Sequence, residues 1–365
     1  MINDSAATWA EVTDDHRAVG TTLAAVEHAL CTSIAELTRQ WNAHAGDRAP
    51  ILGTTDLPSL LAAAVGGGKQ VRPAMVHWGW LAAGGPDHSR QQMITAGAAF
   101  ELLHAFAIIH DDVMDRSETR RGHPTCHVLA TEAYRQARGD HGAELFGDSI
   151  AILVGDLAHA EADHLIGALP SATRSIWRAM VIELVLGQRA DLTGTSPDDR
   201  IAALEVARLK TGSYTIERPL QIGADLGAAS ASAMECLAGY GRHLGRAYGL
   251  RDDVLGTFGD PSRTGKSIDD DLTSGKQTVL LLLAEKRFST DGRRRLRRVT
   301  ANQAGSDEVD RVRQEMIDTG IRQEVEAMID NEIDTALAAL DRHHLDPVAV
   351  DGLTRSAEQL RRRTA

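Results

Sequence analysis

Apolar residues recur at helical spacing along much of the chain. Near its end, Val325, Ile329, Ile333, Ala336 and Leu340 follow one another in steps of three or four residues between acidic neighbours. This spacing predicts a helix with one apolar face. No stretch shows the sustained apolar and polar alternation of a strand bounded by hairpin turns, so the sequence indicates an all-α fold.

The segment from residue 91 to residue 114, QQMITAGAAFELLHAFAIIHDDVM, has a different pattern. It is apolar on almost every face until His110, which is typical of a helix buried in the centre of a bundle. Length alone allows one or two domains. Because the chain has no low-complexity linker and no repeat of fixed period, we expect a single domain over residues 1–365, with residues 1–20 loosely ordered.

Composition narrows the classes of function. The formal net charge of −12 argues against a nucleic-acid partner, because binding a phosphate backbone needs clustered Lys and Arg. The longest aliphatic run, Val279 to Ala284, is far shorter than the roughly 18 residues of a membrane span. The first residues are acidic, unlike a secretion signal, and three widely spaced cysteines, Cys31, Cys126 and Cys236, are typical of a reducing compartment. We therefore expect a cytoplasmic protein with no membrane span.

Three aspartates end the apolar segment: Asp111, Asp112 and Asp115. Residues four apart lie on one face of a helix, so Asp111 and Asp115 should point the same way with about 6 Å between their Cβ atoms. Two such carboxylates repel each other unless a cation lies between them, and Mg²⁺ prefers oxygen ligands. On its own, however, the cluster could equally be a solvated acidic face.

A second pair, Asp252 and Asp253, follows another apolar helical stretch, LAGYGRHLGRAYGL. Two such helices, if they faced each other, could hold several divalent ions. A clamp of several metal ions suits a diphosphate, because the ions neutralise the charge that develops as this group leaves.

Basic residues lie in two glycine-containing segments, GGGKQVRP with Lys69 and Arg72, and ETRRGHPT with Arg120 and Arg121. Guanidinium forks bind pairs of phosphate oxygens and an ammonium group acts as a point charge, so these residues could hold two diphosphates. The alternative is a pair of loops with solvated bases. A nucleotide loop gains no support, because the spacing GxxxxGK[ST] is absent. His104, two helical turns before the first aspartates, could donate a hydrogen bond to the same site or be a satisfied core histidine.

Together these segments resemble the trans-prenyl diphosphate synthase (polyprenyl synthetase) family, and the resemblance is strongest to its bacterial geranylgeranyl diphosphate synthases. It covers about Gly66 to Leu283, and the family's motifs occur in order. They are GGKxxRP at 67–73, HDDxxD at 110–115, RRGxPT at 120–125, GD at 155–156, GQxxD at 187–191, KT at 210–211, and DDxxG at 252–256 followed by GDPSRTGK at 259–266.

This resemblance implies a single large helical bundle of the isoprenoid synthase fold around a central cavity, three Mg²⁺ ions, and a homodimer to whose interface the apolar 91–109 segment could contribute. It implies that isopentenyl diphosphate and an allylic diphosphate are the substrates. The residues implied for isopentenyl diphosphate are Lys69, Arg72, His104 and Arg121; for the allylic diphosphate, Arg120, Lys210 and Lys266; and for the metal ions, Asp111, Asp112, Asp115, Asp252 and Asp253.

The implied chemistry is head-to-tail condensation. Loss of the allylic diphosphate leaves an allylic cation, which the double bond of isopentenyl diphosphate attacks in a dry pocket. The Thr211 hydroxyl and carbonyls freed at a helix break near Lys210 could stabilise the cation. The released diphosphate is the nearest base, so we expect no dedicated side-chain base.

Product length can be predicted from the helix that carries the first aspartates. Phe106 lies five residues before Asp111, about 7.5 Å down the helix axis, and could be the floor of the product pocket. Its neighbour Ala107 is small, and a single aromatic at this place resembles geranylgeranyl-making members of the family. The alternative is that Phe106 is simply a core residue.

The second aspartate motif departs from the family pattern FQxxDDxxD. Gly256 replaces its last aspartate, and Gly249 replaces a glutamine whose oxygen is thought to face the cation. We expect Gly249 to remove that dipole, to open room in the pocket and to cost roughly 1 kcal/mol of helix stability relative to alanine. Ser267 and Asp269 also depart from the usual GKPxGxDL.

Three hypotheses follow from these departures: an elongating synthase of altered selectivity, a class I terpene cyclase, and a non-catalytic partner subunit. The retained basic set of the isopentenyl diphosphate site argues against the cyclase. The retained aspartates argue against a silent subunit.

Overall fold

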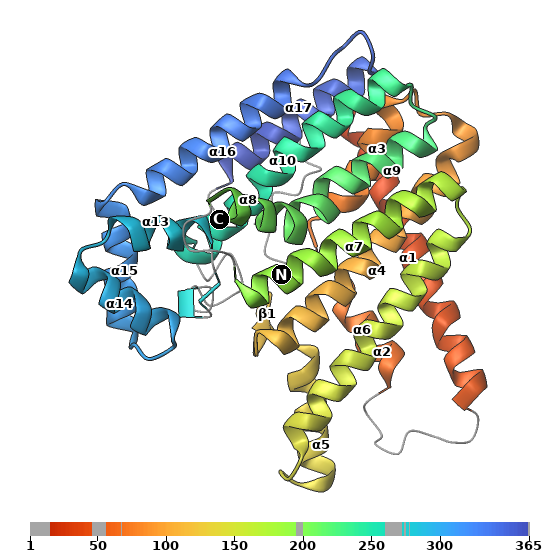
Figure 1. The fold of residues 1–365 in the computed structure, drawn as a ribbon. Helices are drawn as coiled ribbons and strands as arrows, with labels where there is room; N and C mark the ends of the chain where they lie inside the picture. The colour runs from red at the N-terminus through yellow and green to blue at the C-terminus, as the bar shows by residue number, and fades with distance from the viewer. Residues whose placement is uncertain are drawn as a thin grey trace. The chain divides into compact units, whose positions relative to one another are not determined.

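The computed structural model describes residues 15–45, 56–66, 68–194, 200–259, 272–273, 275–276 and 278–363, and these are almost entirely helical (Figure 1). The predicted all-α class is confirmed. Within the described residues, the strands are limited to β1 (Thr119–Arg120) and β2 (His123–Pro124), which pair in antiparallel fashion. The chain divides into two compact units, an N-terminal unit of residues 1–77 and 86–174 and a C-terminal unit of residues 78–85 and 175–365.

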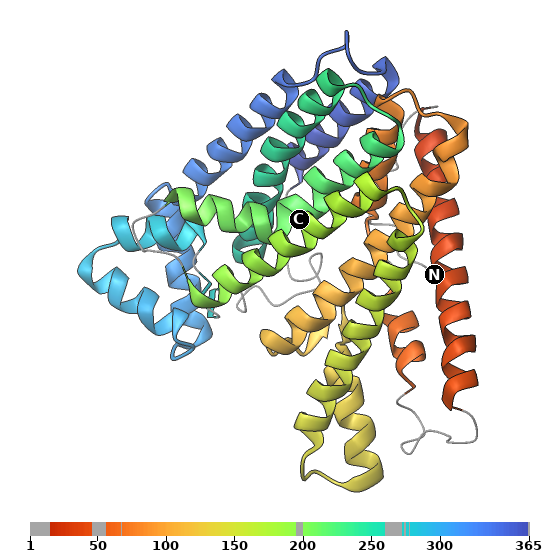
Figure 2. The same cartoon turned by 45° about the vertical axis from the view of Figure 1, so that its right-hand side comes forward.

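The N-terminal unit is built around the apolar helix that the sequence predicts. Its helices are α1 (Asp15–Ala45), α2 (Leu57–Ala64), the first half of α3 (Val71–Ala82), the 3-10 turn η1 (Asp87–Ser89), α4 (Arg90–Met114), α5 (Cys126–Arg138) and α6 (Ala143–Gly167). Helix α4 packs between α1 and α6, and the three run side by side in Figure 2. Residues 15–20 form the first turns of α1, and residues 1–14 lie outside the described residues.

Helix α4 with η1, residues 87–114, is long and apolar enough to cross a membrane by length and composition alone. However, 67% of its most apolar stretch is buried inside the structure. Burial of this kind is expected of the core helix of a folded domain, and side chains such as Met93, Phe100 and Leu103 are completely buried.

The C-terminal unit is arranged around α10 (Ala231–Phe258), which packs against α8, η2, α9, α13, α16 and α17. Its other helices are most of α7 (Ser171–Thr193), α8 (Arg200–Ala207), the π-helix η2 (Arg208–Glu217), α9 (Arg218–Leu226), α13 (Val279–Arg287), α14 (Thr290–Thr300), α15 (Ser306–Asp318), α16 (Ile321–Ala338) and α17 (Pro347–Arg362). In α16 the predicted stripe Val325, Ile329, Ile333 and Ala336 is fully buried, and the helix ends before Leu340.

Among the described residues, most side chains of the 91–109 segment are buried inside their own unit, while Phe106, Ala107 and Ile108 are partly exposed. Each unit instead exposes an apolar face on another helix: Leu145, Ile152 and Leu153 on α6, and Ile182, Val185 and Leu186 on α7. The spacings of seven and eight residues on α6, and of three and four on α7, put each set on one face of its helix.

Candidate active site

A two-residue hairpin sets the direction of the two arginines of the RRG segment. β1 and β2 pair Arg120 with His123, and the turn residues Arg121 and Gly122 have φ of 53° and 76°. Positive φ at both central positions is the geometry of a type I′ turn, which suits the twist of a short hairpin. The turn projects Arg121 onto the glycine-rich loop, where its Nη1 donates to the Gly66 carbonyl oxygen at 2.8 Å.

The glycine-rich loop closes a small pocket together with α4. The residues that line it include Gly66, Gly68, Glu101, His104, Ile108 and Arg121. A Cβ atom at Gly68 would lie 3.2 Å from an Arg121 nitrogen, and Gly66 has a φ of +116°, so glycine lets the loop approach the guanidinium. Lys69 follows in this loop, and Arg72 is 7% exposed in the first turn of α3. Thus Arg121 and His104 line one pocket, and Arg72 lies near enough to act on the pKa of His104.

Electrostatics in this pocket favour a neutral histidine beside fixed positive charge. Burial lowers the pKa of His104 well below its usual range, and the guanidinium groups of Arg72, Arg121 and Arg120 lower it further. Burial also raises the pKa of Glu101, against the opposing effect of Arg72 and Arg121. A neutral imidazole can still donate one hydrogen bond to a phosphate oxygen.

The first aspartate motif ends α4, and its three carboxylates have different surroundings. Asp112 is 3% exposed, and Arg120 donates to both of its oxygens, with Nε at 2.8 and 3.0 Å and Nη2 at 2.6 Å from Oδ1. Asp111 lies 3.8 Å from the same guanidinium and its side chain is 20% exposed. Asp115, one turn later, is the C-cap of α4 and is partly exposed. Asp111 and Asp115 are therefore the two that can reach a ligand from solvent.

Within the described residues, no group of three or more His, Cys, Asp or Glu side chains is arranged to enclose a metal ion. Two partly exposed carboxylates one turn apart fit Mg²⁺ nevertheless, since this ion usually takes one or two carboxylates and completes its shell with water and phosphate. Asp252 and Asp253, both half-buried on α10, offer the same kind of oxygen ligand in the C-terminal unit.

An aromatic and histidine cluster lies below the first motif. Phe106 stacks on His159 of α6, with ring centroids 4.8 Å apart, and its ring centroid is 4.6 Å from that of His110. His110 is held by a hydrogen bond between Nε2 and the Ile152 carbonyl oxygen at 3.0 Å. A Cβ atom at Gly155 would lie 2.3 Å from the His110 ring, so the glycine of the GD motif makes room for it.

The KT motif lies in the π-helix η2. Lys210 Nζ donates to Asp191 Oδ2 at 2.5 Å, which joins the KT motif to the last residue of the GQxxD motif on α7. Ser213 Oγ donates to Glu183 of the same helix at 2.5 Å. A Cβ atom at Gly187 would lie 2.5 Å from the Lys210 backbone nitrogen, so α7 and η2 touch through the glycine of the motif. Hydrogen bonds from Lys210 and Ser213 to α7 thus hold the π-helix on both sides of Thr211.

Gly249 does not open space. A Cβ atom there would lie 2.9 Å from the Ala207 carbonyl oxygen and 3.1 Å from its Cβ, because the end of α8 packs directly on α10. Gly212 and Gly245 meet in the same way, with a built Cβ on Gly212 only 2.3 Å from the Gly245 carbonyl oxygen. The expectation of added room is therefore wrong: the glycine is needed for close approach of two backbones.

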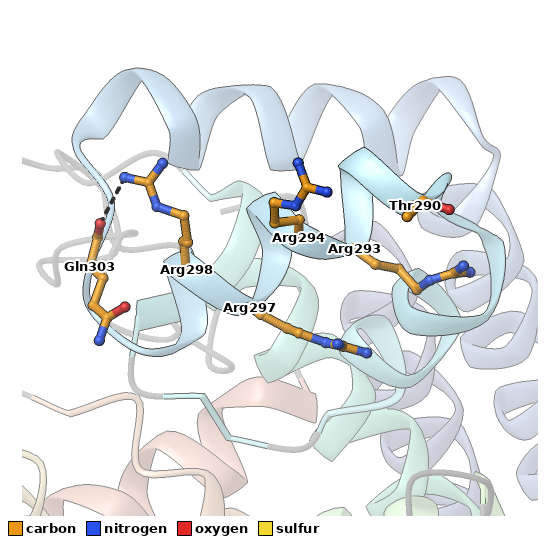
Figure 3. Close-up of a pocket in the computed structure, with 6 residues that line it drawn as sticks. All are labelled: Thr290, Arg293, Arg294, Arg297, Arg298 and Gln303. Atoms are coloured by element: carbon orange, nitrogen blue, oxygen red, sulfur yellow. Dashed lines mark hydrogen bonds between the residues drawn. The ribbon is translucent and has the colours of Figure 1, made fainter.

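Another hollow lies on α14 and is lined by none of these motifs (Figure 3). The residues that line it are Thr290, Arg293, Arg294, Arg297, Arg298 and Gln303. Its guanidinium groups already have partners, such as Asp291 at 3.4 Å from Arg294, Glu285 at 3.5 Å from Arg297 and Glu308 at 3.1 Å from Arg298. Arg293 donates to the Phe288 carbonyl oxygen at 3.0 Å, and we assign this hollow no function.

Comparison with known proteins decides the family. The family model for polyprenyl synthetase matches residues 56–316. The chain is 33% identical to a geranylfarnesyl diphosphate synthase of Aeropyrum pernix, over 70% of this chain and 77% of that protein. It is 30% identical to a geranylgeranyl diphosphate synthase of Sulfolobus acidocaldarius, over 69% and 75% of the two chains.

The chain belongs to the polyprenyl synthetase family.

A solved structure agrees with this assignment. The crystal structure of a geranylgeranyl pyrophosphate synthase from Corynebacterium glutamicum, in complex with isoprenyl diphosphate and magnesium, has a TM-score of 0.83 and 31% sequence identity. The match covers 93% of this chain and 98% of that one. This polyprenyl synthetase is therefore a trans-prenyltransferase of the prenyl diphosphate synthase type. A relative that is 35% identical over 62% of the chain is a farnesyl diphosphate synthase of Mycobacterium tuberculosis, so its relatives differ in product length.

Two residues of this polyprenyl synthetase were not predicted as site residues. Glu101 is 8% exposed and lines the same small pocket as Arg121 and His104. The sequence holds a signal for it, because it precedes His104 by three residues on one helix face. Asp191 was noted only as part of a motif, and its contact with Lys210 needs the fold. Lys266, Ser267 and Asp269 lie outside the described residues, as does Gly67 of the first loop.

Proposed function

We propose that this enzyme condenses isopentenyl diphosphate with an allylic diphosphate and releases geranylgeranyl diphosphate as its main product. The observation that carries the product length is the stack of Phe106 on His159, five residues before Asp111. A growing chain that runs from the aspartates along α4 would meet this double layer of rings about 7.5 Å down the helix axis. A braced floor limits elongation more firmly than a lone side chain that can change rotamer.

The basic residues of the N-terminal unit would bind isopentenyl diphosphate. This role is supported by the electrostatic effect of Arg72 and Arg121 on the pKa of His104, and by the pocket that Arg121 and His104 line together. Lys69 is included because it lies in the same glycine-rich loop. Arginine forks and a neutral imidazole donor together match the oxygens of a diphosphate.

Asp111 and Asp115, and Asp252 with Asp253 beside it, are the residues that would hold Mg²⁺; three ions are proposed. When bound, these ions neutralise charge on the departing allylic diphosphate. Asp112 has a different role in this proposal, because Arg120 already occupies both of its oxygens. It would orient Arg120 toward the diphosphate instead of binding metal directly.

Lys210 and Arg120 would draw the leaving diphosphate away from the allylic carbon, together with Lys266. The Thr211 hydroxyl and carbonyls of the π-helix are the oxygen dipoles that would stabilise the allylic cation, since a π-helix places its backbone hydrogen bonds irregularly at such sites. Attack by the double bond of isopentenyl diphosphate forms the new carbon–carbon bond. The departing diphosphate then accepts the proton, and no side-chain base is needed.

The other two hypotheses are less well supported. A cyclase needs no site for a second diphosphate, and the small pocket lined by Arg121 and the glycine-rich loop supports such a site here. A silent subunit has no use for the Lys210–Asp191 pair or for two partly exposed aspartates one turn apart.

We also propose a homodimer and a cytoplasmic location. The exposed apolar faces of α6 and α7 support an interface, because surfaces of this kind are usually covered. Three cysteines without a disulfide support the reducing compartment.

The test is to supply the purified enzyme with isopentenyl diphosphate, Mg²⁺ and either dimethylallyl, geranyl or farnesyl diphosphate, and to identify the products by mass spectrometry. We expect geranylgeranyl diphosphate as the end product, and longer products from Phe106→Ala. The control is Phe146→Ala, which removes a ring that packs at a tilt against Tyr134, with 4.7 Å between ring centroids, and should leave product length unchanged. A farnesyl end product would contradict the proposed length, and cyclic hydrocarbon formed without isopentenyl diphosphate would favour the cyclase.

A further inference from the structure

The residue that follows α17, Arg363, binds to the second aspartate motif. Its Nη1 donates to Asp252 Oδ1 at 3.2 Å, and its guanidinium carbon lies 5.6 Å from the centroid of the Tyr248 ring. The Arg363 side chain is only 21% exposed and Tyr248 is 8% exposed. A guanidinium group placed in this way over a phenol ring and against a carboxylate gains both a cation–π contact and a charge-assisted hydrogen bond.

The backbone before Arg363 is fixed to the same stretch of α10. Arg251, which is 3% exposed, donates from Nη2 to the Arg361 carbonyl oxygen at 3.1 Å and from Nη1 to Glu326 at 2.9 Å. The Arg361 side chain turns the other way, toward Asp330 at 3.3 Å. Consecutive residues of α10, Arg251 and Asp252, therefore hold the end of α17 by its backbone and by one side chain.

The neighbouring arginine provides an internal comparison. Arg362 is 81% exposed, and its nearest carboxylate, Glu358, is 4.0 Å away. Of these adjacent arginines, Arg363 is the one directed at Asp252, although both carry the same charge. A guanidinium group is not deprotonated in proteins, so Arg363 carries its charge against Asp252.

A guanidinium group on Asp252 Oδ1 occupies a lone-pair direction that a divalent cation would use. The two cations would also repel each other at such short range. We propose that Arg363 is a tethered counter-cation of Asp252 that Mg²⁺ displaces, so that metal binding frees the end of α17 from α10. This inference rests on the proposed function through the assignment of Asp252 as a magnesium ligand.

The test is a calorimetric titration of the full chain with MgCl₂ at constant ionic strength, without substrates. We expect Arg363→Gln to bind Mg²⁺ about tenfold more tightly than the wild type, a change equivalent to about 1.4 kcal/mol. Arg363→Lys, which keeps the charge, should stay near the wild type. The matched control Arg362→Gln loses the same charge from an exposed position and should change the affinity by less than about twofold.

Amide hydrogen exchange of residues 358–363 in the wild type gives a second readout. Mg²⁺ should speed their exchange if it releases the end of α17. Two results together would overturn the inference and leave the proposed function intact. One is a Mg²⁺ affinity of Arg363→Gln that is unchanged or lower, and the other is an exchange rate that Mg²⁺ leaves unchanged. Mg²⁺ binding by Asp252→Asn as tight as that of the wild type would contradict the metal assignment itself.

Discussion

Lys210 and Asp191 form an ion pair, with 2.5 Å between Nζ and Oδ2, that joins the π-helix η2 to α7. Both side chains are mostly buried, with 20% and 12% of their surfaces exposed. A buried charge of this kind has a fixed direction, because moving it away from its partner leaves an unpaired ion. The family motifs GQxxD and KT are therefore two parts of one arrangement that orients the Lys210 ammonium group.

Asp191→Asn should impair binding of the allylic diphosphate. Loss of the charged partner leaves Lys210 free to change rotamer, and a hydrogen bond between charged groups is worth about 1.5–3 kcal/mol, so we expect KM for the allylic substrate to rise by about tenfold or more. Steady-state kinetics with each substrate varied in turn checks this. The control is Asp140→Asn, which breaks an ion pair of the same 2.5 Å length, with Arg135, at a position where Asp140 is 83% exposed. Equal KM values in the two variants would contradict the role of Asp191.

The acid sensitivity of the fold should depend on His104. Its folded pKa lies well below the ordinary value of 6.5, so the folded state binds fewer protons than the unfolded state as pH falls below about 6.5. The free energy of unfolding should therefore decrease in that range. His104→Gln removes the titrating group and should flatten this part of the profile, as measured by denaturant unfolding at a series of pH values.

Titration of Glu101 should change the free energy of unfolding in the opposite direction with pH. Burial raises its folded pKa above the ordinary value of 4.5, so the folded state holds a proton that the unfolded state has lost. This contribution is present at pH 4.5 and below and is lost as pH rises through the folded pKa. Glu101→Gln should therefore gain stability relative to the wild type as pH rises above 4.5. Parallel profiles for the wild type and Glu101→Gln would show that the carboxyl titrates normally.

Gly249→Ala should destabilise the enzyme. The new Cβ would lie 2.9 Å from the Ala207 carbonyl oxygen, a backbone atom that cannot move aside as a flexible side chain can. We therefore expect a cost in the upper part of the usual overpacking range of about 1–3 kcal/mol, which exceeds the helix-propensity gain of roughly 1 kcal/mol. Gly20→Ala on α1 is the control, since nothing lies within 4 Å of its added Cβ and it should be neutral or stabilising. The Tm of both variants, measured by thermal unfolding and compared with that of the wild type, checks this prediction. A higher Tm for Gly249→Ala would mean that α8 can move away from α10 at little cost.

His159→Ala should lengthen the product. It removes the ring behind Phe106 and leaves a cavity, so Phe106 can swing aside for a longer chain. Mass spectrometry of the end products checks this. His164→Ala, an exposed histidine on the same helix, should leave the product distribution unchanged. An unaltered distribution in His159→Ala would show that Phe106 needs no support from α6.

The dimer prediction can be checked on α6. Leu153→Glu puts a charge on the exposed apolar face, and light scattering should show a shift from dimer to monomer at micromolar concentration. Glu144→Gln, a polar change in the first turn of the same helix, is the control. A dimer that persists in Leu153→Glu would place the interface elsewhere.

Much of the fold could be predicted from hydrophobic spacing. Helix α4 and the buried stripe of α16 lie where the pattern placed them, because burial on one side of a helix leaves a direct trace in the residue spacing. The short hairpin that carries Arg120 was not predicted, since two-residue strands are too short to show alternation. The tight packing at Gly249 was also not predicted, because close approach of two backbones depends on what lies opposite, and a single sequence does not record that.

The site residues also divide into those whose place could be predicted from helical spacing and those whose contacts depend on the fold. His104 shares a helix with the first aspartates, so its position followed from helical geometry. The pairing of Asp112 with Arg120 and of Asp191 with Lys210 depends on turns and on a π-helix, whose local geometry has no simple periodic signature.

The ten residues from Arg208 to Glu217 form a π-helix, and a segment of this kind holds more residues in each turn than an α-helix does. Deleting one residue there would let the segment rewind as an ordinary helix and rotate everything before the cut by about 100° around the axis. The Lys210 side chain would then point away from α7, although the residues of every motif would still be present in the sequence. The direction of the Lys210 side chain thus depends on the number of residues in this segment as well as on the KT motif itself.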